Sequence, residues 1–318
     1  MRPRLIVLMT LVVAVVSVIL AVQRITFSIG GPQPAHASLR PRLASYLGVY
    51  EKGSPPSLLP VQNFATAVGR EPNLVETFSG WAQAFDSAFA SSAHDKAITP
   101  LVQIDPTDAS VGGIAAGDYD GYLRAYADSV RAFGHAVVIG FGQEMNARWY
   151  TWGYGHVPAA TFVAAWRHVV SVFRQQGAGN VTWLWTIQAD GPGTGPIASW
   201  WPGSQYVTWV GIDGFYYRPS DTFASIFGST INRVRALTTK PVLLAETAVG
   251  PAAGQFAKVQ DLFRGMTKYR TVGLVWFDVD QDQGTYHQDW RIEDNQAAEY
   301  SFRLGVREAL ASGGQHSG

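Results

Sequence analysis

Ala136-Val137-Val138-Ile139-Gly140-Phe141 is a short apolar run with no polar interruption. A helical pattern follows at Ala159–Gln175, and a second apolar run follows at Val181–Thr186. Continuous rather than alternating apolar runs indicate strands that are buried on both faces, as in a parallel sheet. Strand, helix and strand in this order predict a βαβ unit.

The same unit repeats along the chain. The apolar runs that we interpret as strands are Tyr46–Tyr50, Leu74–Thr77, Ile98–Ile104, Ala136–Phe141, Val181–Thr186, Val207–Ile212, Val242–Ala245 and Val272–Phe277. Helical patterns between them include Tyr119–Ala132, Ala159–Gln175, Thr222–Leu237 and Gly254–Lys268. Repeated strand–helix units over about 270 residues predict an α/β fold, a (β/α)8 TIM barrel. The alternative is a doubly wound open sheet, but Tyr50-Glu51-Lys52-Gly53-Ser54 does not match the Gly-rich phosphate turn of that fold.

The first 37 residues resemble a targeting segment. Two arginines precede an apolar run from Leu5 to Val22, and Ala35-His36-Ala37 offers a small-x-small cleavage site. The run is long for a signal peptide and barely long enough to span a bilayer. Residues 1–37 are therefore interpreted as a signal peptide or an uncleaved N-terminal membrane anchor with a linker. In both cases the positive N-terminus predicts that the rest of the chain is secreted or extracellular.

Composition limits the remaining possibilities. The formal net charge is zero and there is no basic run, so nothing indicates a nucleic-acid partner. The chain has no cysteine, which excludes disulfides, thiolate chemistry and Cys-type zinc sites. We expect one domain over residues 38–310, a flexible tail over 311–318, a monomer, and membrane contact only through the N-terminal segment. We expect no metal and no cofactor.

Two glutamates directly follow predicted strands. The run Ala136–Phe141 is followed by Gly142, Gln143 and Glu144, and the run Val242–Ala245 is followed by Glu246. In a barrel of this type, function collects at the carboxyl ends of the strands. Hydrolysis of a glycosidic bond needs one carboxyl to protonate the leaving oxygen and another to attack, or to activate water. The pair predicts a glycosidase, although either glutamate alone would fit an ordinary loop.

Four segments, in order, resemble glycoside hydrolase family 26, the β-mannanase family of the clan A retaining glycosidases. Gly142–Gly153 resembles its acid/base segment, and Lys240–Thr247 is similar to its nucleophile strand. Trp201–Gly214 and Asp289–Ile292 resemble its sixth-strand approach and its C-terminal end. The resemblance covers residues of about 46–306. It implies a retaining double displacement on a β-linked glycan, without a metal or cofactor.

The resemblance also implies roles for single residues. Glu144 matches the acid/base, and Glu246 matches the nucleophile. Trp149 matches a tryptophan that lines the cleft, and Tyr216 matches a sixth-strand tyrosine that hydrogen-bonds the nucleophile. Trp276 matches an eighth-strand tryptophan below the subsite where the bond breaks.

Two further residues are predicted to contact the substrate. Gln143 stands where the family usually has histidine, and related barrel families have an asparagine there whose amide contacts the sugar 2-hydroxyl. Trp81 follows the second predicted strand and could stack on a sugar ring.

The leading prediction is a retaining endo-β-1,4-mannanase acting on a β-linked polysaccharide. The same mechanism on mixed-linkage β-1,3/1,4-glucan or on β-1,3-xylan is the alternative. A catalytically silent glycan-binding barrel at the cell surface is a third reading, which would normally show loss of a glutamate, whereas both are present.

Overall fold

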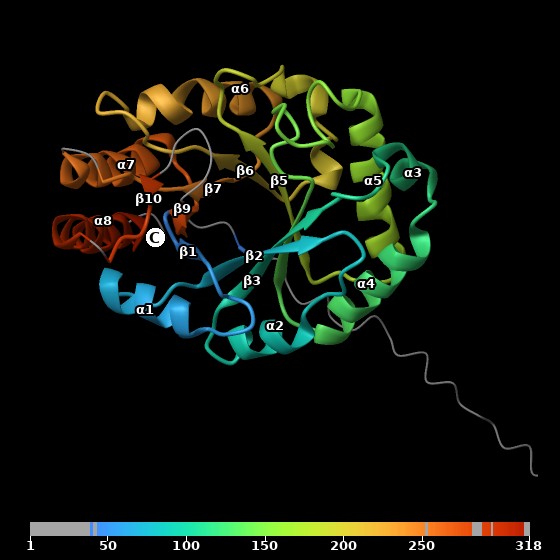
Figure 1. Ribbon diagram of the computed structural model, residues 1–318, viewed down its shortest axis with the longest axis horizontal. Coiled ribbons are helices and arrows are strands. Elements are labelled where there is room, and N and C mark those ends of the chain that lie inside the picture. The colour runs from blue at the N-terminus through green and yellow to red at the C-terminus, as the bar shows by residue number, and fades with distance from the viewer. Residues whose placement is uncertain (1–38, 41–42, 252–253, 282–287, 294, 315–318) are drawn as a thin grey trace, which may run out of the picture. The chain divides into compact units, whose positions relative to one another are not determined.

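The computed structural model describes residues 39–40, 43–251, 254–281, 288–293 and 295–314. The strands of the barrel are β1 (Tyr46–Glu51), β2 (Leu74–Gly80), β3 (Thr99–Asp105), β4 (Val137–Phe141), β5 (Val181–Gln188), β6 (Trp209–Asp213), β7 (Val242–Thr247) and β8 (Gly273–Asp278). They form one closed barrel in chain order, β1 through β8, and all neighbouring strands pair in parallel. The predicted (β/α)8 barrel is confirmed (Figure 1).

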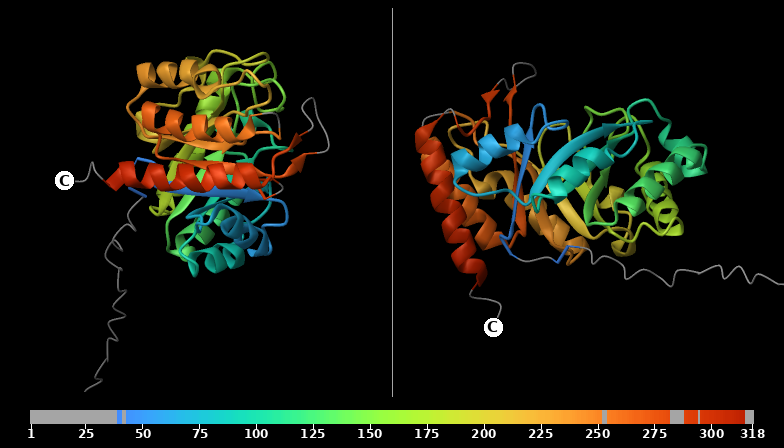
Figure 2. Two further views of the ribbon diagram at one scale, coloured as in Figure 1. Left: turned by 90° about the vertical axis from the view of Figure 1, so that its left-hand side faces the viewer. Right: turned by 90° about the horizontal axis from the view of Figure 1, so that it is seen from below.

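Helices surround the barrel. They are α1 (Leu59–Val68), α2 (Ser87–His94), α3 (Val111–Ala116), α4 (Asp120–Phe133), α5 (Ala159–Gln175), α6 (Ser229–Leu237), α7 (Gln255–Tyr269) and α8 (Gln296–Gly314). Two 3-10 turns (Ile197–Trp200 and Ser204–Tyr206) and a π-helical turn (Ala224–Gly228) lie between them, and β9 (Asp280–Gln281) pairs with β10 (Gln288–Asp289). Figure 2 shows α8 running beside α7.

Every predicted strand is present, and each begins within two residues of its predicted start. The predicted tail is wrong in part, because α8 continues as a helix to Gly314. The predicted targeting segment, residues 1–37, lies outside the described residues. Among the residues that are described, no helix is both long enough and apolar enough to cross a membrane.

Helix α5 illustrates why these sequences fold as they do. Its buried side chains include Phe162, Ala165, Trp166, Val169 and Phe173, which recur at the spacing of one helix face. Pro158 stands directly before the first helical residue, at a position where a missing N–H costs nothing. The buried face packs against the outside of the barrel, so the amphipathic pattern sets which side of the helix faces the strands.

Inside the barrel, an apolar layer lies below a polar one. The apolar layer includes Leu74, Leu101, Val138, Leu184, Trp209, Leu243, Ala245 and Val275. Two residues further along their strands, Glu76, Gln103 and Thr186 form a buried hydrogen-bonded group. Gly140 makes room for it, because a Cβ there would lie 1.8 Å from Oε1 of Gln103.

Side chains of a strand alternate between the interior of the barrel and the helices. In β8, Val275 belongs to the interior layer, while Leu274 and Trp276 belong to the core between strands and helices. This alternation decides which residues at the strand ends can reach the carboxyl-terminal rim.

Candidate active site

Glu144 and Glu246 lie on the same rim, because all eight strands are parallel and both residues stand at carboxyl ends. Glu144 is in the loop after β4, and Glu246 is the next-to-last residue of β7. Asp213, the last residue of β6, is paired in register with Glu246. The structure thus places the two predicted catalytic glutamates where the fold concentrates function.

The backbone of Glu144 adopts an unusual conformation, with φ of +52°. A glutamate in the left-handed region is strained by about 1 kcal/mol or more and needs support from its surroundings. Its N–H donates to the carbonyl of Thr186 at 3.0 Å, and its carbonyl accepts from the N–H of Ala147 at 2.8 Å. Gly142, at φ +56°, lies so close to the Phe162 ring that a Cβ would approach it to 2.8 Å. The loop therefore holds Glu144 in one orientation.

Several carboxyl groups share this rim and the interior just below it. Burial raises the pKa of Glu144 to about 7, with the charge of Asp105 adding to the effect and the hydrogen bond from Trp149 opposing it. Burial, followed by the charges of Glu76, Glu144 and Asp105, raises the pKa of Glu246 well above its ordinary value. Neighbouring carboxyls cannot all be ionised at once, so protons stay on part of the group at neutral pH.

Trp149 contacts the predicted acid/base directly. Its indole Nε1 donates to Oε2 of Glu144. The side chain is 49% exposed, so one face of a large ring is open to solvent beside the carboxyl. Such a ring can stack on a sugar, and its contact with substrate stays a prediction.

Gln143 is almost fully buried and turns its side chain to Asp105, the last residue of β3. Since this hydrogen bond lowers the pKa of Asp105, the amide nitrogen is the donor. Burial dominates, however, and raises the pKa of Asp105 to about 7. The amide Oε1 of Gln143 is buried without a hydrogen-bond partner in the described part of the chain. Its contact with a substrate stays a prediction.

The predicted role of Tyr216 is wrong. Its hydroxyl donates to Oδ2 of Asp261 on α7 at 3.2 Å, and the side chain is 1% exposed. Strand alternation explains this: Asp213 and Phe215 point to the rim, whereas Gly214 and Tyr216 point to the helices. The rim-facing residue of this segment is Phe215, whose ring packs against Phe277 and Trp290 and carries no hydroxyl.

The predicted role of Trp276 is wrong for the same reason. The indole is fully buried, packs edge-on against Phe302 of α8, and donates to the carbonyl of Trp290 at 3.0 Å. Its neighbour Phe277 faces the rim instead and stacks on Tyr50 at 5.1 Å. Trp81 is half-buried and packs against Tyr119 and Tyr122, and its contact with substrate stays a prediction.

Two tyrosines that the sequence did not single out face the carboxyl groups. Burial and then the charges of Glu246 and Glu76 raise the pKa of Tyr50, which is paired in register with Glu76. Burial raises the pKa of Tyr150, and the charges of four carboxyls, of which Glu144 has the largest effect, raise it further. The ring of Tyr150 stacks on that of Trp152, with the ring centres 4.3 Å apart. The aromatic stretch after Glu144 was a signal for Tyr150.

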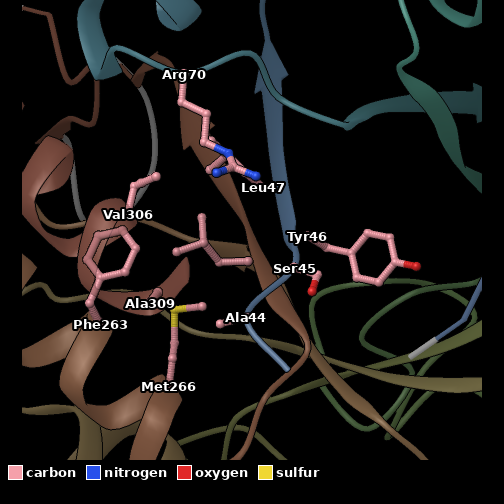
Figure 3. A pocket seen from close by; sticks show the side chains of 10 residues that line it. Ala44, Ser45, Tyr46, Leu47, Arg70, Phe263, Met266, Val306 and Ala309 are labelled. Atoms are coloured by element: carbon pink, nitrogen blue, oxygen red, sulfur yellow. The ribbon is translucent and has the colours of Figure 1, made fainter. Parts of the chain in front are cut away.

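The described residues contain no group of three or more histidine, aspartate or glutamate side chains arranged to hold a metal ion. A separate small cavity of about 20 Å³ lies between the start of β1 and helices α7 and α8 (Figure 3). Its walls include Tyr46, Leu47, Phe263 and Met266. That volume holds about one water molecule, and the cavity lies at the opposite end of β1 from the rim.

The sequence profile described as Glycosyl hydrolase family 26 matches residues 121–304, more than half of the chain. Endoglucanase H of Acetivibrio thermocellus is 27% identical over 277 residues, covering 82% of this chain and 30% of that protein. Beta-1,3-xylanase TXYA of a Vibrio species is 25% identical over 174 residues, covering 51% of this chain and 36% of that protein. The chain spans about a third of the length of these curated relatives.

Solved structures share the fold. The YdhT protein of Bacillus subtilis superposes with a TM-score of 0.61 at 17% identity, covering 84% of this chain and 87% of that one. A GH26 β-mannanase from Bacteroides ovatus, BoMan26A, superposes with a TM-score of 0.61 at 14% identity, covering 85% of this chain and 90% of that one. The match to the family profile, on a barrel with a glutamate at the ends of β4 and β7, shows that the chain belongs to glycosyl hydrolase family 26.

Proposed function

We propose that this protein is a retaining glycoside hydrolase that cleaves a β-linked polysaccharide, with Glu144 as acid/base and Glu246 as nucleophile. One observation carries the proposal: the two carboxyls stand on the same rim of the barrel, close enough that the charge of Glu144 raises the pKa of Glu246. Membership of the family supports the same reading.

In the first step, Glu144 gives its proton to the leaving oxygen while Glu246 attacks the anomeric carbon and forms a glycosyl-enzyme. In the second step, Glu144 removes a proton from water, and the resulting hydroxide displaces Glu246. A group that gives and then takes a proton works best with a pKa near the operating pH. The pKa of about 7 for Glu144 suits this double role.

Three polymers have support as the substrate. β-1,4-Mannan is supported by neighbours in fold that are named mannanases, at 14% to 16% identity. A glucan, such as mixed-linkage β-glucan, is supported by the relative named an endoglucanase, which aligns over 82% of this chain. That name describes a protein more than three times as long as the matched part. β-1,3-Xylan follows from shorter alignments. Reducing-end assays on the three polymers, with product sizing, decide among them and show whether cleavage is internal.

We propose also that the barrel acts outside the cytoplasm, because two arginines precede the apolar run Leu5–Val22. Cell fractionation of the full-length chain tests this. Activity in the medium or on the outer side of the membrane is expected, and a full-length soluble protein in the cytosol would contradict export.

The assignment of roles is tested with two isosteric variants. Glu246→Gln should abolish hydrolysis of every substrate, because no nucleophile is left. Glu144→Gln should abolish cleavage of polysaccharide but spare the first step on an activated aryl glycoside, whose leaving group needs little protonation. Glu71→Gln, at an exposed carboxyl before β2, is the matched control and should behave as wild type. Equal losses in both catalytic variants on both substrates would contradict the roles.

A further inference from the structure

Asn146, two residues beyond Glu144, fastens the loop of the predicted acid/base to strand β5. Its side-chain Nδ2 donates to the carbonyl of Gln188 at 2.8 Å, and its Oδ1 accepts from the N–H of the same residue at 2.8 Å. The side chain of Asn146 is completely buried. One amide group thus pairs with both backbone groups of the last residue of β5, as peptide groups of a neighbouring strand would.

The loop takes the place of a strand at this edge of β5. The register between β4 and β5 ends at the pair Ile139 and Trp183, so the backbone of β5 nearer the rim needs other partners. The carbonyl of Thr186 accepts from the N–H of Glu144 at 3.0 Å. Two residues further along β5, the amide of Asn146 supplies the next pair of bonds.

The main chain of Asn146 holds the loop that follows β5. Its carbonyl accepts from the N–H of Gly195 at 2.7 Å. The next residue, Ala147, forms an antiparallel bridge with Thr194. Asn146 therefore stands where two sets of contacts meet: its side chain is fixed to β5, and its main chain is fixed to the loop beyond β5.

These contacts lie next to a strained residue. Glu144 has a φ of +52°, and a side chain with a Cβ persists in this region only where its surroundings determine the conformation. Met145 alone separates Glu144 from Asn146 in the chain. Without the amide of Asn146, the backbone of Glu144 can relax toward an ordinary conformation, and its carboxyl then moves away from the position that the loop gives it.

We propose that Asn146 is a positioning residue for the acid/base: its amide, paired with both backbone groups of Gln188, keeps Glu144 in the left-handed conformation and so holds the carboxyl at the leaving oxygen. This inference rests on the proposed function, in which Glu144 protonates that oxygen. Because Asn146 is completely buried, it acts through Glu144 and not by contact with the substrate.

A positioning role differs from a purely structural one in how the loss of activity depends on the leaving group. Cleavage of polysaccharide needs the proton of Glu144, whereas the first step on an activated aryl glycoside needs little of it. Since kcat/KM covers the steps up to the glycosyl-enzyme, its value on the aryl glycoside depends little on where the Glu144 carboxyl lies. A displaced acid therefore lowers kcat/KM selectively on polysaccharide, while a loosened fold lowers it on both substrates.

The experiment compares Asn146→Ala with a matched control, Asn73→Ala. The amide of Asn73 makes the same kind of paired bonds at the opposite end of the barrel: Oδ1 accepts from the N–H of Leu47 at 3.0 Å, and Nδ2 donates to the carbonyl of Ser45 at 2.8 Å. Both variants should be less stable than wild type in denaturant unfolding, because each loses two hydrogen bonds.

Only Asn146→Ala should change the ratio of the two activities. Its kcat/KM on polysaccharide should fall ~10- to 100-fold, the loss expected when a catalytic group is displaced by about 1 Å. On an activated aryl glycoside of the sugar that the wild-type enzyme releases, kcat/KM should stay within about threefold of wild type. In Asn73→Ala the ratio of the two values should be that of wild type.

Asn146→Ser keeps the proposal testable if the alanine variant does not fold. Serine carries one polar atom directly on Cβ, so it cannot pair with both groups of Gln188, and the same selective loss is expected. Equal losses on both substrates, or an undiminished activity on polysaccharide in a folded variant, would overturn the proposal. The same selective loss in Asn73→Ala would overturn it too. A wild-type enzyme without glycosidase activity would instead contradict the proposed function.

Discussion

The indole nitrogen of Trp149 donates a hydrogen bond to Oε2 of Glu144, five residues earlier in the chain. This contact lowers the pKa of Glu144 against the larger effect of burial, which raises it. Trp149 therefore connects a solvent-open ring surface for the sugar to the group that must protonate the leaving oxygen.

Replacing Trp149 with phenylalanine should shift the pH profile. Without the indole donor the pKa of Glu144 rises further, so its acid form persists to higher pH. The alkaline limb of kcat/KM on polysaccharide should move up by up to about one pH unit, while KM increases. An activated aryl glycoside, which needs little protonation, is the control and should show no such shift. A limb that moves to lower pH would contradict the role of this contact.

Gln143 should contact the substrate through its amide Oε1, which has no hydrogen-bond partner in the part of the chain that the structure describes. Its amide nitrogen is turned to Asp105, so the buried Oε1 is the atom left to accept from a sugar hydroxyl. Gln143→Ala should lower kcat and kcat/KM together, because contacts to the 2-hydroxyl strengthen in the transition state. Gln143→His should keep measurable activity with a changed pH profile, since histidine titrates near neutrality.

A 2-deoxy substrate separates this role from a structural one. If Gln143 contacts the 2-hydroxyl, Gln143→Ala should cost little on the 2-deoxy sugar. Equal losses on the normal and 2-deoxy substrates would show that Gln143 supports the fold instead.

Tyr216 should matter for stability rather than for catalysis. Tyr216→Phe removes the hydroxyl that donates to Asp261, so the free energy of unfolding should fall by about 1 kcal/mol. Because the side chain faces α7, kcat/KM should stay within about twofold of wild type. Denaturant unfolding and steady-state kinetics measure both. A large loss of kcat with unchanged stability would contradict this assignment and show that Tyr216 contributes to catalysis.

The barrel was predictable because its strands are continuous apolar runs at regular intervals, and periodicity is the strongest local signal in a sequence. Glu144 and Glu246 were predictable because each stands within three residues of the end of such a run, and the fold brings all carboxyl ends to one rim. These inferences need only the order of elements and the direction of the strands.

The roles of Tyr216 and Trp276 were predicted wrongly because the role of a residue at a strand end depends on the side to which its side chain points. A shift of one residue turns a side chain from the barrel interior to the helices, and neither motif nor composition fixes which residues point inward. Glu76 was missed for a related reason: inside the run Leu74–Thr77 it counts as one polar residue in an apolar strand. Only the packed barrel shows that Nε2 of Gln103 donates a hydrogen bond to it.

The stereochemistry of the first product tests the central claim most directly. Proton NMR of the anomeric signals during hydrolysis of the β-linked polysaccharide shows which anomer the enzyme releases before mutarotation mixes the two. Double displacement through Glu246 predicts that the β-anomer appears first, because two inversions restore the original configuration. Initial release of the α-anomer would contradict the account, since it requires direct attack of water with Glu246 as a base.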